Sequence, residues 1–186
     1  MGHSTADREE KIVSLFRQGD ALAMDVLYAD YAPYLTGVCA RYISDDDTLK
    51  DVLQESFIKI FTQMGTFEYR GQGSLRAWMN RIVVNESLQS LRRQKRDQAM
   101  MLDTDPPDTA DEEPNTAELS REEMGMLLRK LPDGYRAVLN LYVIEGWSHQ
   151  EIARQLGIKP DSSASQLHRA KTMMARLIRN YKTNKL

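Results

Sequence analysis

Residues 146–171 constrain the fold of this chain more than any other segment, because their pattern predicts two short helices joined by a tight turn. Ser148 is followed three residues later by Glu151, which is the spacing of a capping box at the start of a helix. Gly157 then offers the left-handed backbone conformation in which many helices end. The segment is therefore expected to fold as a helix, a turn and a second helix.

The second predicted helix, capped by Asp161 or Ser162, has two unlike faces. Apolar residues recur every three or four positions and should face the core: Leu167, Ala170, Met174, Leu177 and Tyr181. The opposite side and its flanks carry short polar and basic side chains: Ser162, Ser165, Gln166, His168, Arg169 and Arg176. Such side chains hydrogen-bond base edges and phosphates in a DNA major groove. The pattern indicates a DNA-binding helix-turn-helix, although two packed helices with a solvated polar face would also produce it.

The rest of the 186-residue chain also predicts helices. Strict apolar alternation is nearly absent and glycine is scarce, so the expected fold class is all-α. Helices are expected at residues 7–17, 20–31, 33–43, 45–64 and 74–96, and then at 117–130 and 134–145. The single cysteine, Cys39, excludes an internal disulfide and is expected to be buried as a small hydrophobic residue.

The net charge of −2 hides an uneven distribution along the chain. Residues 70–96 contain seven Lys or Arg and one acid, and residues 124–186 contain eleven Lys or Arg and four acids. Between these regions, residues 97–123 contain ten acids and one arginine. Because local charge sets the attraction to phosphates, the two basic regions remain candidates for binding nucleic acid.

The acidic stretch also predicts a domain boundary. Residues 103–115 contain three prolines, six acids and almost no apolar side chain, so they cannot form a core. We therefore predict two small helical domains, residues 1–96 and 118–186, joined by a flexible acidic linker at residues 97–117. A linker of this kind allows the two domains to dock at separate sites.

The outer face of the predicted 45–64 helix carries Asp51, Gln54, Glu55 and Ile58. An exposed isoleucine beside carboxylates suits the centre of a protein-docking patch, but an ordinary solvated face remains equally open. Three aspartates at residues 45–47 raise the question of a metal site. Because consecutive helical residues diverge, they suit a helix N-terminus better, and we predict no metal or cofactor. With no nucleophile and base in a recognisable pattern, we predict no enzymatic activity.

Residues 67–96 combine aromatic rings with cations. The rings of Phe67, Tyr69 and Trp78 lie close in sequence to Arg70, Arg76 and Arg81. Such rings beside a positive track suit single-stranded nucleic acid, and Trp78, Arg81 and Asn85 would share one helix face. The alternative is that Trp78 and Phe67 belong to the core, whereas Tyr69 lies in a glycine-flanked loop.

Together these segments resemble an extracytoplasmic-function (ECF) sigma factor of bacterial RNA polymerase, across nearly the whole chain. Residues 51–59 (DVLQESFIK) are similar to the polymerase-clamp helix of that family. Residues 69–85, which begin YRG and end WMNRIVVN, are similar to its promoter-melting segment. Three further segments are similar to the promoter-binding C-terminal domain of the family: residues 131–136 (LPDGYR), 145–153 (EGWSHQEIA) and 165–171 (SQLHRAK).

The resemblance implies a cytoplasmic sigma factor that binds core RNA polymerase and directs promoter-specific transcription initiation. The first domain would dock on the polymerase clamp and open the downstream (minus-10) element, and the second would read the upstream (minus-35) element as duplex. Polymerase binding is assigned to Asp51, Gln54, Glu55 and Ile58. The downstream element is assigned to Tyr69, Arg70, Gln72, Gly73, Ser74, Arg81 and Asn85, the first five forming a loop for a flipped base. The upstream element is assigned to Ser162, Ala164, Ser165, Gln166, His168 and Arg169.

One departure from the family concerns the last of these sets. Many relatives have basic residues at the positions of Ala164 and Gln166, and both are uncharged here. This suggests fewer phosphate or guanine contacts from this helix than the family pattern implies.

The expected partners are core RNA polymerase and promoter DNA, and an anti-sigma factor is a further candidate partner. The chain has no run of eighteen apolar residues, so no membrane insertion is expected, and we expect a monomer within the holoenzyme. Two alternatives stay open. One is a conventional duplex-binding helix-turn-helix regulator, and the other is a sigma-like decoy that binds an anti-sigma factor without initiating transcription.

Overall fold

Helices form the regular structure of the described residues, 5–97 and 119–184 of the computed structural model, and these residues contain no strand. The predicted all-α class is confirmed. By their internal contacts the residues divide into a first unit, Met1–Ser90, and a second unit, Leu91–Leu186. The predicted acidic linker lies outside the described residues, apart from its first residue, Asp97.

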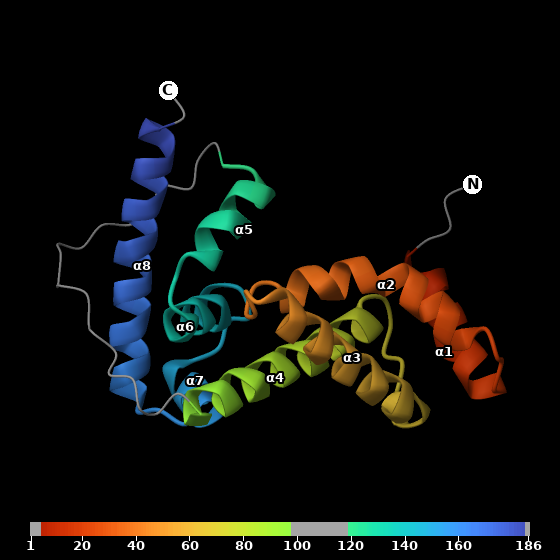
Figure 1. Ribbon diagram of the computed structural model, residues 1–186. Helices are drawn as coiled ribbons and strands as arrows, with labels where there is room; N and C mark the ends of the chain where they lie inside the picture. Colours follow the sequence, from red (N-terminus) through yellow and green to blue (C-terminus); the bar gives the residue numbers. More distant parts are fainter. Residues whose placement is uncertain (1–4, 98–118, 185–186) are drawn as a thin grey trace. The chain divides into compact units, whose positions relative to one another are not determined.

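The first unit contains four helices and a short 3-10 turn among its described residues (Figure 1). They are α1 (Thr5–Gln18), α2 (Ala23–Cys39), α3 (Asp46–Gln63), η1 (Met64–Thr66) and α4 (Ser74–Asp97), of which α4 continues past the contact boundary at Ser90. Contacts join α1 to α2 and α2 to α3. The core consists of fully buried apolar side chains from all four helices, among them Ile12, Leu27, Leu35, Cys39, Ile60, Leu75 and Met79. The predicted burial of Cys39 is confirmed, and burial raises the pKa of its thiol.

Helix α2 replaces two of the predicted helices. The boundary expected before Pro33 is wrong, because α2 runs through Pro33 without interruption. Proline lacks one backbone donor, but Pro33 is exposed, while Tyr31 and Leu35 on either side are buried. The stability gained by burying the apolar side chains of the flanking turns outweighs the one helix hydrogen bond that Pro33 cannot donate on the solvent-facing side. The carboxylate of Asp20 accepts from the N–H of Leu22 at 2.8 Å in the turn before the helix.

Helix α3 begins as its aspartates predict. The side chain of Asp45 accepts from the N–H and the hydroxyl of Thr48, at 2.8 and 2.7 Å, and these bonds lower the pKa of Asp45. Asp45 is thus the N-cap, and the next two aspartates lie in the first turn, where they complement the helix dipole. The buried face of α3 consists of Leu49, Val52, Ser56, Phe57 and Ile60.

The second unit contains the other four helices (Figure 1). They are α5 (Arg121–Arg129), α6 (Asp133–Val143), α7 (His149–Leu156) and α8 (Pro160–Thr183). Helix α8 packs against α5, α6 and α7. One core cluster joins α8 to α5 and the following turn through Leu127, Leu131, Met174 and Ile178. The Tyr181 hydroxyl adds a polar contact, donating to the Glu123 carboxylate at 2.8 Å.

Local signals start and stop these helices. The capping box predicted at Ser148 and Glu151 is present, and a second one is formed by Ser120 and Glu123 at the start of α5. Gly157 ends α7 with φ of +67°, as predicted. The predicted cap of α8 is wrong. That helix begins one turn earlier, with Pro160 at its first position and Lys159 as an N-cap that makes no side-chain bond.

Candidate protein-binding and nucleic-acid surfaces

The four residues assigned to polymerase binding lie on one exposed face of α3. Asp51, Gln54, Glu55 and Ile58 follow the three- and four-residue steps of a helix, and all four are exposed. Ile58 has 49% of its surface accessible, which is high for a large apolar side chain. The structure thus brings the four together as an apolar residue with polar neighbours, and we refer to them as the α3 face.

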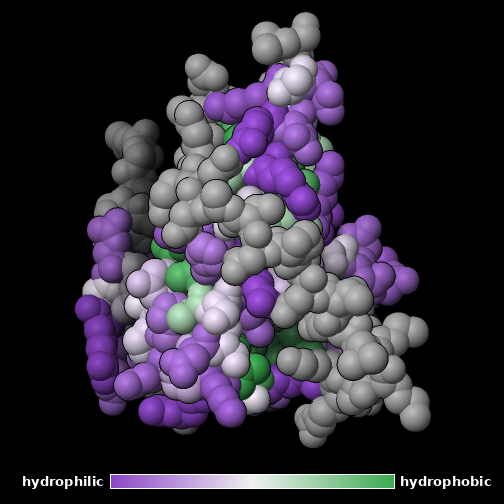
Figure 2. Space-filling view, turned by 90° about the vertical axis from the view of Figure 1, so that its left-hand side faces the viewer, coloured by the Kyte–Doolittle hydropathy of each residue, from purple (hydrophilic) through white to green (hydrophobic). Residues whose placement is uncertain are grey.

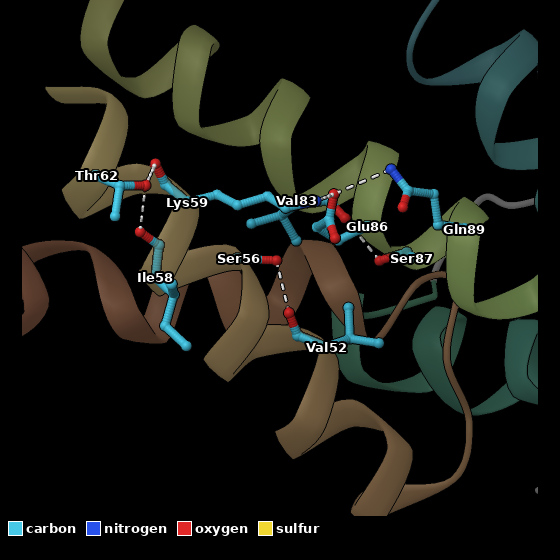
Figure 3. Close-up of polar contacts among 9 residues, drawn as sticks. All are labelled: Val52, Ser56, Ile58, Lys59, Thr62, Val83, Glu86, Ser87 and Gln89. Carbon is cyan, nitrogen blue, oxygen red and sulfur yellow. Dashed lines mark hydrogen bonds and ion pairs between the residues drawn. The ribbon is translucent and has the colours of Figure 1, made fainter.

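Next to the α3 face in sequence, a partly buried ion pair connects α3 to α4 (Figure 3). The Lys59 ammonium lies 2.7 Å from the Glu86 carboxylate, whose side chain is only 6% exposed. The Gln89 amide also donates to Glu86, at 3.2 Å. Ile58 points away from α4 while Lys59 reaches towards it. The bridge therefore joins residues adjacent to two predicted sites, since Lys59 follows Ile58 and Glu86 follows Asn85.

The loop before α4 holds most of the residues assigned to the downstream element. Gly71 and Gly73 have φ of +104° and +85°, a region that other residues rarely adopt. The Ser74 hydroxyl donates to the carbonyl of Gly71 at 2.6 Å and accepts from the N–H of Arg70 at 3.2 Å. Ser74 is thus the first residue of α4, and its hydroxyl holds the preceding loop through these two bonds. Arg70 and Gln72 are exposed, and Tyr69 is partly buried.

The group that caps α4 is Glu9 of α1, which the sequence analysis missed. Its carboxylate is 1% exposed and accepts from the N–H groups of Gly73, Leu75 and Arg76, at 2.9, 3.4 and 3.3 Å. The Tyr31 hydroxyl also donates to it at 3.3 Å, and burial together with this carboxylate raises the pKa of Tyr31.

A signal for Glu9 was present in the sequence. Glu9 precedes Ile12 and Val13 by three and four residues, so it shares the buried face of α1. A carboxylate on such a face needs hydrogen-bond partners. Pattern alone could not place those partners some 64 residues away, at the start of α4.

The remaining residues assigned to the downstream element lie along α4. They are Arg81, which is exposed, and Asn85, which is partly buried, and the partly buried Trp78 shares their helix face at steps of three and four. Trp78 packs against Phe67, with ring centroids 4.9 Å apart. The two rings therefore contact each other, and both are partly buried, whereas Tyr69 lies in the loop before α4.

The helix-turn-helix joins its two helices by a polar contact that the sequence analysis also missed. His149 Nδ1 lies 3.0 Å from the hydroxyl of Ser163, which is fully buried at the start of α8. The ring of Tyr142 stacks on His149, with centroids 4.7 Å apart. Together with Gly157, these contacts fix the angle at which α8 leaves the turn.

The residues assigned to the upstream element lie in the first three turns of α8. Ala164 and Ser165 are exposed, and the others are partly buried: Ser162, Gln166, His168 and Arg169. The Ser165 hydroxyl donates to the carbonyl of Asp161 at 2.9 Å. Figure 2, which views the side where α8 lies in Figure 1, shows mostly hydrophilic surface over the described residues.

Two absences hold for the residues that the structure describes. None of their helices is long and apolar enough to cross a membrane. None of their His, Cys, Asp and Glu side chains gather in groups of three that could hold a metal ion.

Comparison with known proteins decides the family. Residues 27–97 match the model of sigma-70 region 2, and residues 121–174 match that of sigma-70 region 4. The RNA polymerase sigma factor CarQ of Myxococcus xanthus is 30% identical over 165 residues, covering 88% of this chain and 93% of CarQ. The ECF RNA polymerase sigma-E factor of Haemophilus influenzae is 28% identical over 179 residues, covering 89% and 93%. The chain is an ECF sigma factor.

This assignment confirms the predicted family and its general activity. The sigma factor directs core RNA polymerase to promoters, and core polymerase and promoter DNA are its partners. One of the solved structures that the chain matches is the sigma factor RpoE of Bartonella quintana in complex with the anti-sigma factor NepR. It has a TM-score of 0.49 and 20% identity, covering 86% of this chain and 98% of that chain.

Proposed function

We propose that this sigma factor divides its work between its two helical units. The first unit docks on the polymerase clamp through the α3 face and opens the downstream element with the loop and outer face of α4. The second unit reads the upstream element as duplex through the first three turns of α8. The observation that carries the proposal is that each assigned set lies on a single helix or on a loop and the helix that follows it, with its side chains exposed or partly exposed.

The protein would work in the cytoplasm, where the polymerase acts, as a monomer within the holoenzyme and without enzymatic chemistry of its own. An anti-sigma factor remains a further candidate partner. Run-off transcription with core polymerase on a promoter library tests the function as a whole. A sigma-like decoy would give no promoter-specific transcript, and a conventional duplex-binding regulator would not be retained on core polymerase in a pull-down.

The upstream role is tested by replacing Arg169, the first basic residue of α8. Arg169→Ala should weaken upstream-element binding by about 1–3 kcal/mol if the guanidinium reads a base. Arg179→Ala, further along the same helix, is the matched control. Binding of the full-length sigma factor would be measured across upstream-element variants. Equal losses on every sequence would make Arg169 a phosphate contact, and no loss would remove it from the interface.

The downstream role is tested at Tyr69 and Asn85. Stacking on one base contributes roughly 1–3 kcal/mol, so Tyr69→Ala should reduce open-complex occupancy about tenfold or more, and Asn85→Ala should act in the same step. Tyr69→Phe retains the ring and should behave almost like the wild type. Both alanine variants should keep clamp binding, and a template with a pre-melted downstream element should restore part of the transcription. Normal opening by both, measured by permanganate reactivity of unpaired thymines, would contradict the assignment.

A further inference from the structure

Helix α1 lies ahead of residue 27, where the region 2 match begins, yet it delivers a buried charge to the start of α4. Glu9 is the only acid among the described residues that is 1% exposed or less. Such a carboxylate is stable only where donors replace its lost hydration. Here the donors are three backbone N–H groups at the start of α4 and the hydroxyl of Tyr31 on α2.

The position of those donors gives Glu9 more than a general stabilising role. The first N–H groups of a helix have no partner within the helix, and its dipole favours a negative charge there. The shortest of the three bonds goes to Gly73, which belongs to the loop rather than to the helix. Glu9 therefore fastens the end of the same loop that carries Tyr69 at its beginning.

That loop needs an external restraint. Gly71 and Gly73 both have positive φ, and a glycine chain has many alternative conformations of similar energy. Inside the loop, the Ser74 hydroxyl bridges Arg70 and Gly71, but these bonds span only a few residues. Glu9 provides the bond to a different helix. Helix α1 is itself held to α2, because the Arg8 guanidinium makes two bonds to the Asp30 carboxylate, at 2.6 and 2.8 Å.

We propose that Glu9 is a positioning residue for promoter opening: it selects the loop conformation that accepts the flipped base. Glu9 touches no DNA in this scheme and acts through Gly73 and the first turn of α4. A loop that spends only a fraction of its time in the binding conformation has its affinity reduced by that fraction. The inference rests on the proposed role of the loop at residues 69–74, and it adds a residue outside the matched region.

The central test compares Glu9→Gln with Glu10→Gln. Glu10 is the exposed neighbour on α1, so its substitution controls for the loss of one charge from that helix. The glutamine at position 9 keeps an oxygen acceptor but lacks the charge that complements the helix dipole. Glu9→Gln should lower open-complex formation on duplex promoter by about threefold to thirtyfold, the range of a carboxylate at a partly buried helix N-terminus. Glu10→Gln should leave it unchanged.

Two further variants extend the series, one with a smaller expected effect than Glu9→Gln and one with a larger effect. Tyr31→Phe removes only the hydroxyl that donates to Glu9, and it should weaken opening less than Glu9→Gln. Glu9→Ala removes every acceptor and should weaken opening most. If Glu9→Ala fails to fold, the glutamine and phenylalanine variants still decide the matter. Thermal unfolding and core-polymerase binding of each full-length variant would be measured first.

The decisive readout is base discrimination, which a purely structural role would not change. Tyr69→Ala would first identify the downstream position at which this variant loses the wild-type base preference. Transcription by each variant would then be compared on promoters with each of the four bases at that position. A positioning role predicts that Glu9→Gln flattens the preference at that same position while core binding stays normal. An unchanged preference in a folded, polymerase-bound Glu9→Gln variant would overturn the inference alone. If Tyr69→Ala itself left every base preference intact, the proposed role of the loop would fall instead.

Discussion

The two helical units differ in how far apart in sequence some of their side-chain partners lie. The first unit contains pairs that join distant segments: Glu9 bonds to Gly73, Tyr34 bonds to Asn80 at 3.3 Å, and Lys59 pairs with Glu86. Its buried serines, Ser56 and Ser87, bond instead to carbonyls four residues earlier. In the second unit the prominent pairs are three residues apart, in the exposed capping boxes at Ser120 and Ser148 and in the Asp133–Arg136 pair. Two exceptions in the second unit reach further, namely His149 to Ser163 and Tyr181 to Glu123.

This difference implies that the binding surfaces of the two units respond differently to the loss of a contact. Local contacts need only the helix that contains them, although short helices themselves depend on tertiary packing. Long-range contacts exist only when the unit is folded. If one partner of such a contact is lost, the other is left buried without a hydrogen bond, which is costly. The surface of the second unit should therefore be robust, whereas that of the first unit should depend on its tertiary packing. Each unit contains one tryptophan, Trp78 or Trp147, so the two can be followed separately.

The largest loss of stability is expected for a local contact of the second unit. It is the strongest test of this comparison, because the second unit is the one expected to be robust. Arg136 is 1% exposed and donates to the carbonyl of Leu131 at 3.0 Å and to Asp133 at 2.6 Å. Arg136→Ala leaves both acceptors without this donor and creates a cavity. The free energy of unfolding of the second unit should fall by about 3–5 kcal/mol.

The measurement is urea unfolding followed by Trp147 fluorescence in a Trp78→Phe background. Arg154→Ala, an exposed arginine on α7, is the control and should change stability by about 0.5 kcal/mol or less. A small loss for Arg136→Ala would mean that its local contacts contribute little, and the contrast between the units would weaken.

An intermediate effect is expected at the bridge next to the α3 face. Glu86→Ala should destabilise the first unit by about 2–3 kcal/mol, less than a fully buried pair, because Lys59 is 38% exposed. A double-mutant cycle with Lys59→Ala would isolate the pair and should give a coupling of about 1–2 kcal/mol. The matched control is the exposed Lys50–Asp47 pair on the same helix, for which a coupling near zero is expected. Equal couplings for the two pairs would remove the special role of the long-range contact.

The smallest effect is expected at the capping box of α7. Ser148→Ala should cost about 1 kcal/mol, the usual value for an N-cap serine. Glu151→Ala should cost a similar amount, and the two together less than their sum, because they belong to one reciprocal motif. Gln150→Ala, exposed in the same turn, is the control. Additive losses in urea unfolding would show that the two side chains act independently.

The same division between local and distant contacts explains what could be predicted from the sequence. The capping box at Ser148, the left-handed Gly157 and the N-cap Asp45 were predictable because each depends on residues within one or two turns. The continuous helix through Pro33 was not, because the burial that overrides a proline comes from other helices. Glu9 and the pairing of Lys59 with Glu86 were not predictable for the same reason, since pattern shows that a residue is buried but not what it meets.

The start of α8 at Pro160 has a consequence for how this sigma factor holds DNA. No lysine or arginine occurs on α8 before Arg169, so on the proposed orientation the part of the helix that enters the groove displaces few cations from the duplex. Each phosphate neutralised by a protein steepens the decline of log affinity with log salt by about 0.9. Upstream binding should then fall only gently as ionic strength rises. It would rest on hydrogen-bond geometry at base edges and on delivery by the polymerase, not on the release of counterions.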